Sequence, residues 1–370
     1  MEDNQKEYAG YDYALLIPTL LLLCFGLIMA YSASSFLAAH RYGDSYYFLK
    51  RQATFCVMGL FCMILAKNIP TRLYQSYIYP ILIVSFGLLV LVLIPGLGVK
   101  VGGASRWVRL PGFSFQPSEL AKLSLAFYLA YSMAKKGPDM AIFSKGFLPH
   151  LIVTGLFMGL ILVQPDLGSC IIIGTWLVII LFVGGVKIWH LAGLALCSLP
   201  VIFWLIWRAD YRLKRWWAFL NPWEDPQGLG FQIIHSFLAF GSGGFWGLGL
   251  GNSKQKLFYL PEPHTDFIFS ITAEELGWVG VAVMIILFTM IILRGILISF
   301  NARDLHSSYL AMGISTFLGL QVLINLGVVM GLLPTKGLTL PLMSYGGSSL
   351  VVTLFSIGIL LHISAERKGD

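Results

Sequence analysis

Apolar residues gather in long runs along the whole chain, with short polar stretches between them. Each run has about 20 residues, enough for a helix to cross a bilayer core of roughly 30 Å. The runs lack the alternation of barrel strands, and helices satisfy their own backbone in lipid. The pattern predicts an all-α polytopic membrane protein with about ten transmembrane helices. The predicted spans are 13–35, 49–67, 76–96, 117–135, 147–164, 168–185, 188–207, 267–295, 305–332 and 342–364.

Composition supports one integral membrane domain over residues 1–370. Hydrophobic residues make up 57% of the chain and charged residues only 12%, whereas a soluble domain carries about 25% charged residues. The first span is preceded by an acidic flank and followed by nine more spans, so we expect it to stay rather than be removed as a signal peptide. The QPDLG turn at 164–168 is short, which predicts antiparallel neighbours on either side.

Charge in the connecting loops predicts the orientation. Ten spans place both termini on one side, and the short loops of that side carry more Lys and Arg than the opposite ones. The positive-inside rule then places both termini in the cytoplasm. Residues 208–266 form a large extracytoplasmic loop between the seventh and eighth spans.

Several kinds of chemistry find no support. The five cysteines fall inside predicted spans without a CxxC pair, so they read as small apolar residues. The glycine-rich stretch 241–251 follows no predicted strand, which favours a flexible or tightly packed loop over a nucleotide site. Nothing indicates ATP as an energy source or nucleic acid as a partner.

Two clusters in the long loop carry candidate chemistry. The segment LPEPHTDF at 260–267 places Glu262, His264 and Asp266 where a loop meets an apolar run, and ionisable groups at such a place usually have a function. Arg212, Lys214 and Arg215 lie beside tryptophans at the start of the loop. Such a cluster is either an interfacial anchor or a cradle for an anionic headgroup such as a diphosphate.

Charged and polar residues also occur inside the spans. Glu119 and Lys122 are three residues apart, so they share a helix face and can pair. They form either a helix-locking ion pair or the wall of a cavity that steers a polar substrate. Glu274 and Glu275 follow Asp266 by about two turns, so at least one should face protein or water. Gln321 and Asn325 read first as interhelical hydrogen-bonding residues.

Taken together, motifs in this order resemble the SEDS family (shape, elongation, division and sporulation). They are ASRW at 104–107, FQPSELAK at 115–122, QPDLG at 164–168, NPW at 221–223, LPEPHTDF at 260–267, EELG at 274–277 and PLMSYGGSS at 341–349. The segment GLLPTKGLTLP at 331–341 is most similar to members that act in cell division. Members that act in elongation usually differ at Thr335 and Lys336. Pro263 departs from the family pattern but leaves the polar residues in place.

The resemblance implies a peptidoglycan glycosyltransferase of the cytoplasmic (inner) membrane at the division septum. Its substrate would be lipid II, a disaccharide-pentapeptide on undecaprenyl diphosphate, used as donor and acceptor. By resemblance Asp266 is the general base. Substrate-binding residues are then expected at Arg106, Glu119, Lys122, Arg212, Arg215, Glu262, His264, Lys336 and Ser344. No cofactor is certain; a divalent cation, Mg or Mn, stays open because leaving diphosphate charge must be balanced.

The resemblance also implies protein partners: a class B penicillin-binding protein acting as transpeptidase, and other membrane proteins of the divisome. Two other functions remain open from the sequence. A flippase for lipid II would suit ten spans with buried charges, although no inverted repeat is evident. A scaffold that recruits a transpeptidase is the third alternative.

Overall fold

A computed structural model describes residues 11–101, 104–110, 113–228, 230–257, 260 and 263–366. Each predicted span coincides with a helix. These helices are α1 (Tyr13–Tyr42), α2 (Tyr47–Asn68), α3 (Thr71–Leu93), α4 (Pro117–Lys136), α5 (Leu148–Val163), α6 (Leu167–Val183), α7 (Ile188–Trp207), α10 (Ile268–Phe300), α11 (Leu305–Val329) and α12 (Gly347–Ala365). The polytopic helical membrane fold predicted from the sequence is confirmed.

Eight of the described helices are long and apolar enough to cross a membrane by length and composition. The two others among the ten differ for identifiable reasons. Helix α6 is apolar but has only 17 residues, and α4 carries Glu119 and Lys122 in its first turns and two lysines in its last. The short turn between α5 and α6 makes them packed neighbours, as predicted.

Local signals in the sequence set several helix ends. The side chains of Asp12, Asp166 and Asp304 accept backbone N–H groups at the starts of α1, α6 and α11, which satisfies donors that the first helical turn leaves open. Pro117 opens α4, where its missing N–H costs nothing. Gly43 ends α1 in the left-handed conformation.

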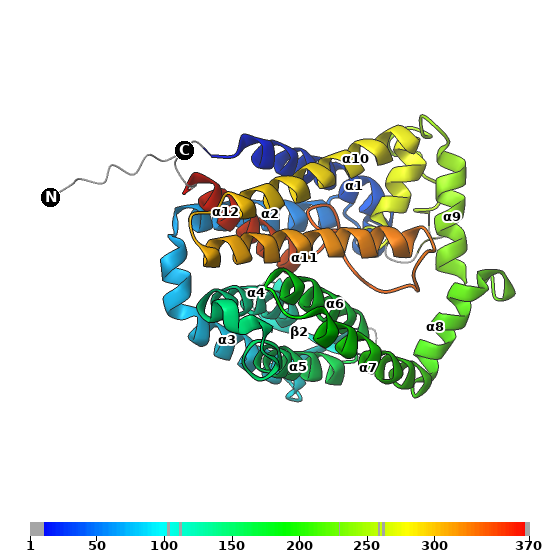
Figure 1. The fold of residues 1–370 in the computed structure, drawn as a ribbon. Coiled ribbons are helices and arrows are strands. Elements are labelled where there is room, and N and C mark those ends of the chain that lie inside the picture. The colour runs from blue at the N-terminus through cyan, green and yellow to red at the C-terminus, as the bar shows by residue number, and fades with distance from the viewer. Residues whose placement is uncertain are drawn as a thin grey trace.

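The long helices run side by side, and the start of α1 and the end of α12 lie at the same end of the bundle (Figure 1). Two shorter helices cross the opposite end: α8 (Asp210–Leu220) and α9 (Phe231–Gly243). Burial is very uneven. In an apolar 18-residue stretch of each helix, 83% of the residues are buried in α12, whereas 6% are buried in α7. Helix α12 therefore belongs to the core, and α7 lies at the periphery.

No strands were predicted from the sequence, and the structure adds a small sheet between α3 and α4. The sheet is antiparallel and consists of β1 (Gly98–Val101), β2 (Ala104–Leu110) and β3 (Phe113–Phe115), in which Val108 pairs with both Gly98 and Phe115. Strand pairing depends on partners at a distance, which the hydropathy of a loop does not record. Further short elements are η1 (Gly137–Ala141), η2 (Phe143–Phe147) and η3 (Pro222–Glu224).

Candidate functional site: a cationic pocket beside Asp266

A cationic pocket of about 160 Å³ lies at the end of the bundle that bears α8. Four cations line it: Arg106 from β2, Arg212 and Arg215 from α8, and Lys336 from the connection between α11 and α12. Asp166, from the turn between α5 and α6, is the one carboxylate among the lining residues described. The lining therefore carries excess positive charge. Lys214, also in the basic cluster, does not line it.

Two cations of this pocket, Arg106 and Arg212, are held in position by hydrogen bonds. Arg106 donates from Nε to the carbonyl of Gln164 at 3.2 Å and from Nη2 to that of Pro165, and it lies 3.9 Å from the Asp166 carboxylate. Arg212 donates to the carbonyl of Leu205 at 2.9 Å. Burial lowers the pKa of the Lys336 ammonium, and the Asp166 charge works against that shift. Cations fixed before binding suit an anion with several oxygens.

An apolar cavity of about 510 Å³ opens beside the cationic pocket, between α5, α6 and α7. The two share Leu167, Ile171 and Ile202 in their walls, so one continues into the other. Among the residues described in α7, only Leu191 is buried. The combination of a charged pocket and a membrane-level apolar cavity fits an amphiphile with an anionic head.

Asp266 stands next to this pocket. A Cβ built on Gly337, which lines the pocket, would lie 3.1 Å from Oδ2 of Asp266. The glycine therefore lets the carboxylate approach the segment that carries Lys336. The Asp266 residue is half-buried, so part of it stays accessible, and a general base must reach the proton that it removes.

The backbone around Asp266 is fastened to the α11–α12 region by hydrogen bonds. The Asn325 side-chain amide donates to the carbonyls of Asp266, at 3.2 Å, and Leu338, at 2.6 Å. The Ser344 hydroxyl donates to the carbonyl of Thr265 at 2.5 Å and accepts the N–H of Leu340 at 2.8 Å. Ser344 was expected to bind substrate. The residue is buried, and its hydroxyl holds the Asp266 segment; substrate binding by Ser344 stays a prediction.

His264 is similarly buried, with 1% of its surface exposed. Its ring packs 4.4 Å from that of Phe48 and 5.4 Å from that of Tyr345, and the N–H of Tyr345 donates to its carbonyl at 2.8 Å. Burial, helped by the Arg41 charge, lowers the pKa of His264 to about 4. The ring is therefore neutral at pH 7. Glu262, the remaining member of the motif, lies outside the described residues.

Glu119 and Lys122 form the expected ion pair, with Nζ and Oε1 2.7 Å apart, and both are buried. They line a separate small cavity of about 30 Å³ between α4, α11 and α12, together with Gln321. Gln321 lies one helical turn from Asn325, about 6 Å along α11. The pair thus sits below the Asp266 segment, and the structure does not bring it into the cationic pocket.

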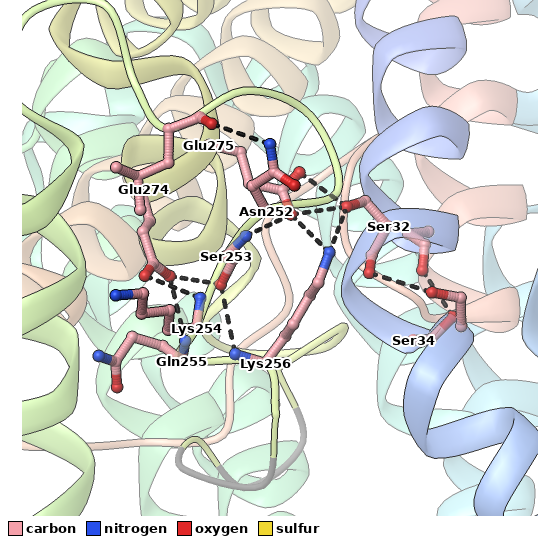
Figure 2. A network of polar contacts seen from close by, with 12 residues as sticks. Ser32, Ser34, Asn252, Ser253, Lys254, Gln255, Lys256, Glu274 and Glu275 are labelled. Atoms are coloured by element: carbon pink, nitrogen blue, oxygen red, sulfur yellow. Dashed lines mark hydrogen bonds and ion pairs between the residues drawn. The ribbon is translucent and has the colours of Figure 1, made fainter.

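Sequence reasoning missed a buried polar network at a break in α10. Gly277 has φ 64° there, and residues 244–249 pair their backbone with the break. Glu275 contacts Lys256 at 2.8 Å and Ser32 at 2.7 Å. Glu274 accepts the N–H groups of residues 254 and 255 (Figure 2). Only the two adjacent carboxylates gave a signal in the sequence, because their partners are distant or unremarkable residues.

The donor set of the cationic pocket contains a single carboxylate among four cations, and the described residues include no group of three or more His, Cys, Asp or Glu that could hold a metal ion. These described side chains do not form a protein-built metal centre. A divalent cation carried in with a diphosphate stays a prediction.

The fold and site define a polytopic membrane protein with a cationic pocket, an apolar cavity and an adjacent carboxylate at one end of its bundle. Residues 13–369 match the FtsW/RodA/SpoVE family model, described as cell cycle protein, and the chain belongs to this family, the SEDS family.

Named relatives agree with that assignment. The chain is 49% identical over 366 residues to the probable peptidoglycan glycosyltransferase FtsW of Geobacter metallireducens, covering 99% of this chain and 98% of the relative. It is 46% identical to stage V sporulation protein E of Bacillus subtilis, covering 96% and 98%. It also resembles a chain of a solved peptidoglycan synthase complex, concerned with the coordination of polymerization and crosslinking. The TM-score is 0.80 at 32% identity, with 97% and 99% covered.

Proposed function

We propose that the protein is a peptidoglycan glycosyltransferase of the FtsW type that polymerises lipid II during cell division. The observation that carries this proposal is the approach of Asp266 to a pocket of four cations that continues into an apolar cavity. In this arrangement the pocket binds the diphosphate of the donor. The apolar cavity along α7 takes the start of its polyprenyl chain.

The reaction follows from these positions. The acceptor sugar hydroxyl gives its proton to the Asp266 carboxylate as its oxygen attacks the anomeric carbon of the donor. A new C–O glycosidic bond forms, and the bond between the anomeric carbon and the diphosphate oxygen breaks. The electron pair leaves with the diphosphate, whose growing charge is stabilised by Arg106, Arg212, Arg215 and Lys336. The activated donor supplies the driving force, so the reaction needs no ATP.

The position and partners of the protein follow from the same proposal. Both ends of the described chain lie at one end of the bundle (Figure 1), and the basic bias of the short loops places that end in the cytoplasm. The pocket then faces outward, where the wall is built. A class B penicillin-binding protein would crosslink the new strands, in line with the crosslinking described for the solved synthase complex. Location at the septum and contacts with other divisome membrane proteins complete the proposal.

A purified-component assay tests the polymerase against a flippase or a scaffold. We expect the protein in detergent micelles, with its transpeptidase partner added, to convert lipid II into glycan strands. Flipping has no meaning without a bilayer, and a scaffold forms no polymer. The same assay tests Asp266→Asn, which removes the proposed base. Its matched control is Asp139→Asn, because the Asp139 side chain forms a surface ion pair with Lys145 far from the proposed reaction. No polymer from the wild-type mixture would overturn the proposal.

A further inference from the structure

A second cleft, of about 540 Å³, lies between the second half of α1, the turn that follows it, and residues 250–257 of the long loop. Its volume is in the range of small-molecule sites. It shares no lining residue with the cationic pocket. Its floor is fixed by the buried network in which Ser32 and Lys256 meet Glu275 (Figure 2). The shape of the cleft is therefore fixed by the fold, and the proposed reaction assigns no role to it.

The chemistry of this cleft differs from that of the cationic pocket. Its lining combines hydroxyl-bearing residues (Tyr31, Ser32, Ser35 and Ser45) with apolar ones such as Phe36 and Leu257. The Ser32 hydroxyl is already bonded to Glu275 and Lys256. Lys256 is the charged residue among its lining, and the Glu275 carboxylate compensates that ammonium at 2.8 Å. A cleft with hydroxyls and a neutralised charge is poorly suited to a diphosphate. It matches an uncharged molecule that combines hydroxyl groups with apolar C–H faces, which is the chemistry of a sugar.

Aromatic rings lead from the cleft to the Asp266 segment. Tyr31 in the cleft stacks on Tyr46 with ring centroids 5.3 Å apart. The next residue, Tyr47, contacts Phe48 at 5.3 Å, and Phe48 contacts His264 at 4.4 Å, two residues before Asp266. Tyr46 is 51% exposed. Sugars pack the C–H faces of their rings on exposed aromatic side chains, so Tyr46 extends the cleft as a carbohydrate surface. Phe48 and His264 are buried, and they join that surface to the Asp266 segment by ring packing.

The Asp266 segment lies between the two sites. His264 touches Phe48 on the side of the cleft, and Asp266 approaches Gly337 on the side of the cationic pocket. A transfer between two sugar substrates needs one site for the leaving diphosphate and another for the attacking hydroxyl. Both must reach the same base, and this arrangement allows it.

We propose that the cleft and Tyr46 bind the glycan of the acceptor, the substrate whose hydroxyl attacks. This inference rests on the proposed function and adds a second substrate site to it. The bound hydroxyl forms the glycosidic bond and gives its proton to Asp266, while the diphosphate leaves from the cationic pocket with the bonding electron pair. Tyr31, Ser35 and Ser45 would determine acceptor binding without touching the donor diphosphate.

Binding of a lipid-free, uncharged β-1,4-linked N-acetylglucosamine tetrasaccharide to the full chain in detergent tests the site, with calorimetry as the readout. Ser35→Trp fills the cleft, and we expect it to weaken binding at least tenfold. Cys24→Trp adds the same bulk at an exposed position of α1 outside the cleft and should bind like wild type. Arg215→Ala should also bind the tetrasaccharide like wild type, because it alters the other pocket.

Ser45→Trp, in the turn after α1, is a second blocking variant if Ser35→Trp does not fold. No binding by wild type, or equal binding by the blocking variants and Cys24→Trp, overturns the acceptor site. Failure of the proposed function would look different. Wild-type protein would then bind the tetrasaccharide in the cleft, with loss in Ser35→Trp, yet make no polymer from lipid II.

Discussion

At the scale of single residues, the site depends on how neighbours fix a few side chains. Asp266 owes its position to Asn325 and Ser344, which bind the backbone of its segment, and its access to the missing side chain at Gly337. Asn325 was expected only to join helices. Its two hydrogen bonds show that a residue of α11 also sets the place of the candidate base.

Replacing Asp266 by Asn tests its role as base. The change keeps the size and much of the hydrogen bonding but removes basicity, and general bases contribute roughly 10²- to 10⁴-fold to a rate. We expect polymerisation to fall by at least about 100-fold, with thermal stability and lipid II binding close to wild type. The assay follows strand formation from lipid II in detergent. Near-normal synthesis would show that the carboxylate is structural.

The buried His264 ring leads to a prediction about how the stability of the fold depends on pH. Its pKa is about 4 in the folded protein and 6.5 in an open chain, so the unfolded state takes up a proton first as pH falls. This group therefore destabilises the fold progressively from about pH 6.5 down to about 4, by at most about 3 kcal/mol. Above about pH 6.5 the His264 ring does not change how stability depends on pH.

Thermal unfolding of wild type and His264→Gln at several pH values measures this effect. The variant loses packing, so it should be less stable at pH 7.5, but the difference should shrink as pH falls towards 4. His40→Gln, at an exposed position of α1, should run parallel to wild type. A constant gap between wild type and His264→Gln would contradict the buried neutral ring.

At the scale of elements, the sequence predicted most of the fold because membrane helices are encoded locally. Hydropathy alone placed ten helices, and the spacing of Glu119 and Lys122 predicted their contact. The sheet at 98–115 and the network of Ser32, Lys256 and Glu275 were missed. These features join segments far apart in the chain, and neither length nor periodicity records which residues meet. The placement of Asp166 among the cations of the pocket was missed for the same reason.

The buried pair of Glu119 and Lys122 in helix α4 leads to a prediction about stability. Removing one partner strands a charge in a setting with little water, so Glu119→Ala and Lys122→Ala should each lower the free energy of unfolding by about 3 kcal/mol. The double variant should lose clearly less than the sum, since contacting residues couple. Thermal unfolding of wild type, the two single variants and the double variant measures the coupling.

Lys50→Ala is the surface control, because its partner Asp44 is exposed to solvent. This substitution should lower the free energy of unfolding by under about 1 kcal/mol. Additive losses at Glu119 and Lys122 would argue against an energetically coupled pair.

At the scale of the whole molecule, the cationic pocket exists only because four distant segments meet at one end of the bundle: β2, the α5–α6 turn, α8 and the α11–α12 connection. The basic cluster of the long loop left two functions open, interfacial anchor and headgroup cradle. The structure divides the cluster. Arg212 and Arg215 line the pocket, whereas Lys214, between them in sequence, does not. This division turns neighbouring residues of one helix into a variant and its control.

Arg215→Ala should therefore weaken binding of intact lipid II about tenfold, the effect of losing roughly one charge-assisted hydrogen bond. Binding of an analogue without the diphosphate should be unchanged, because that lipid offers no anion to the guanidinium. Lys214→Ala removes a cation from the same helix but not from the pocket, so it should leave both affinities near wild type. Titration of the purified protein with each lipid at fixed ionic strength gives the comparison, since salt would weaken an anchor and a cradle alike. If Arg215→Ala weakens both lipids equally, or matches Lys214→Ala for the intact lipid, the arginine is an interfacial anchor and the diphosphate is bound by other residues.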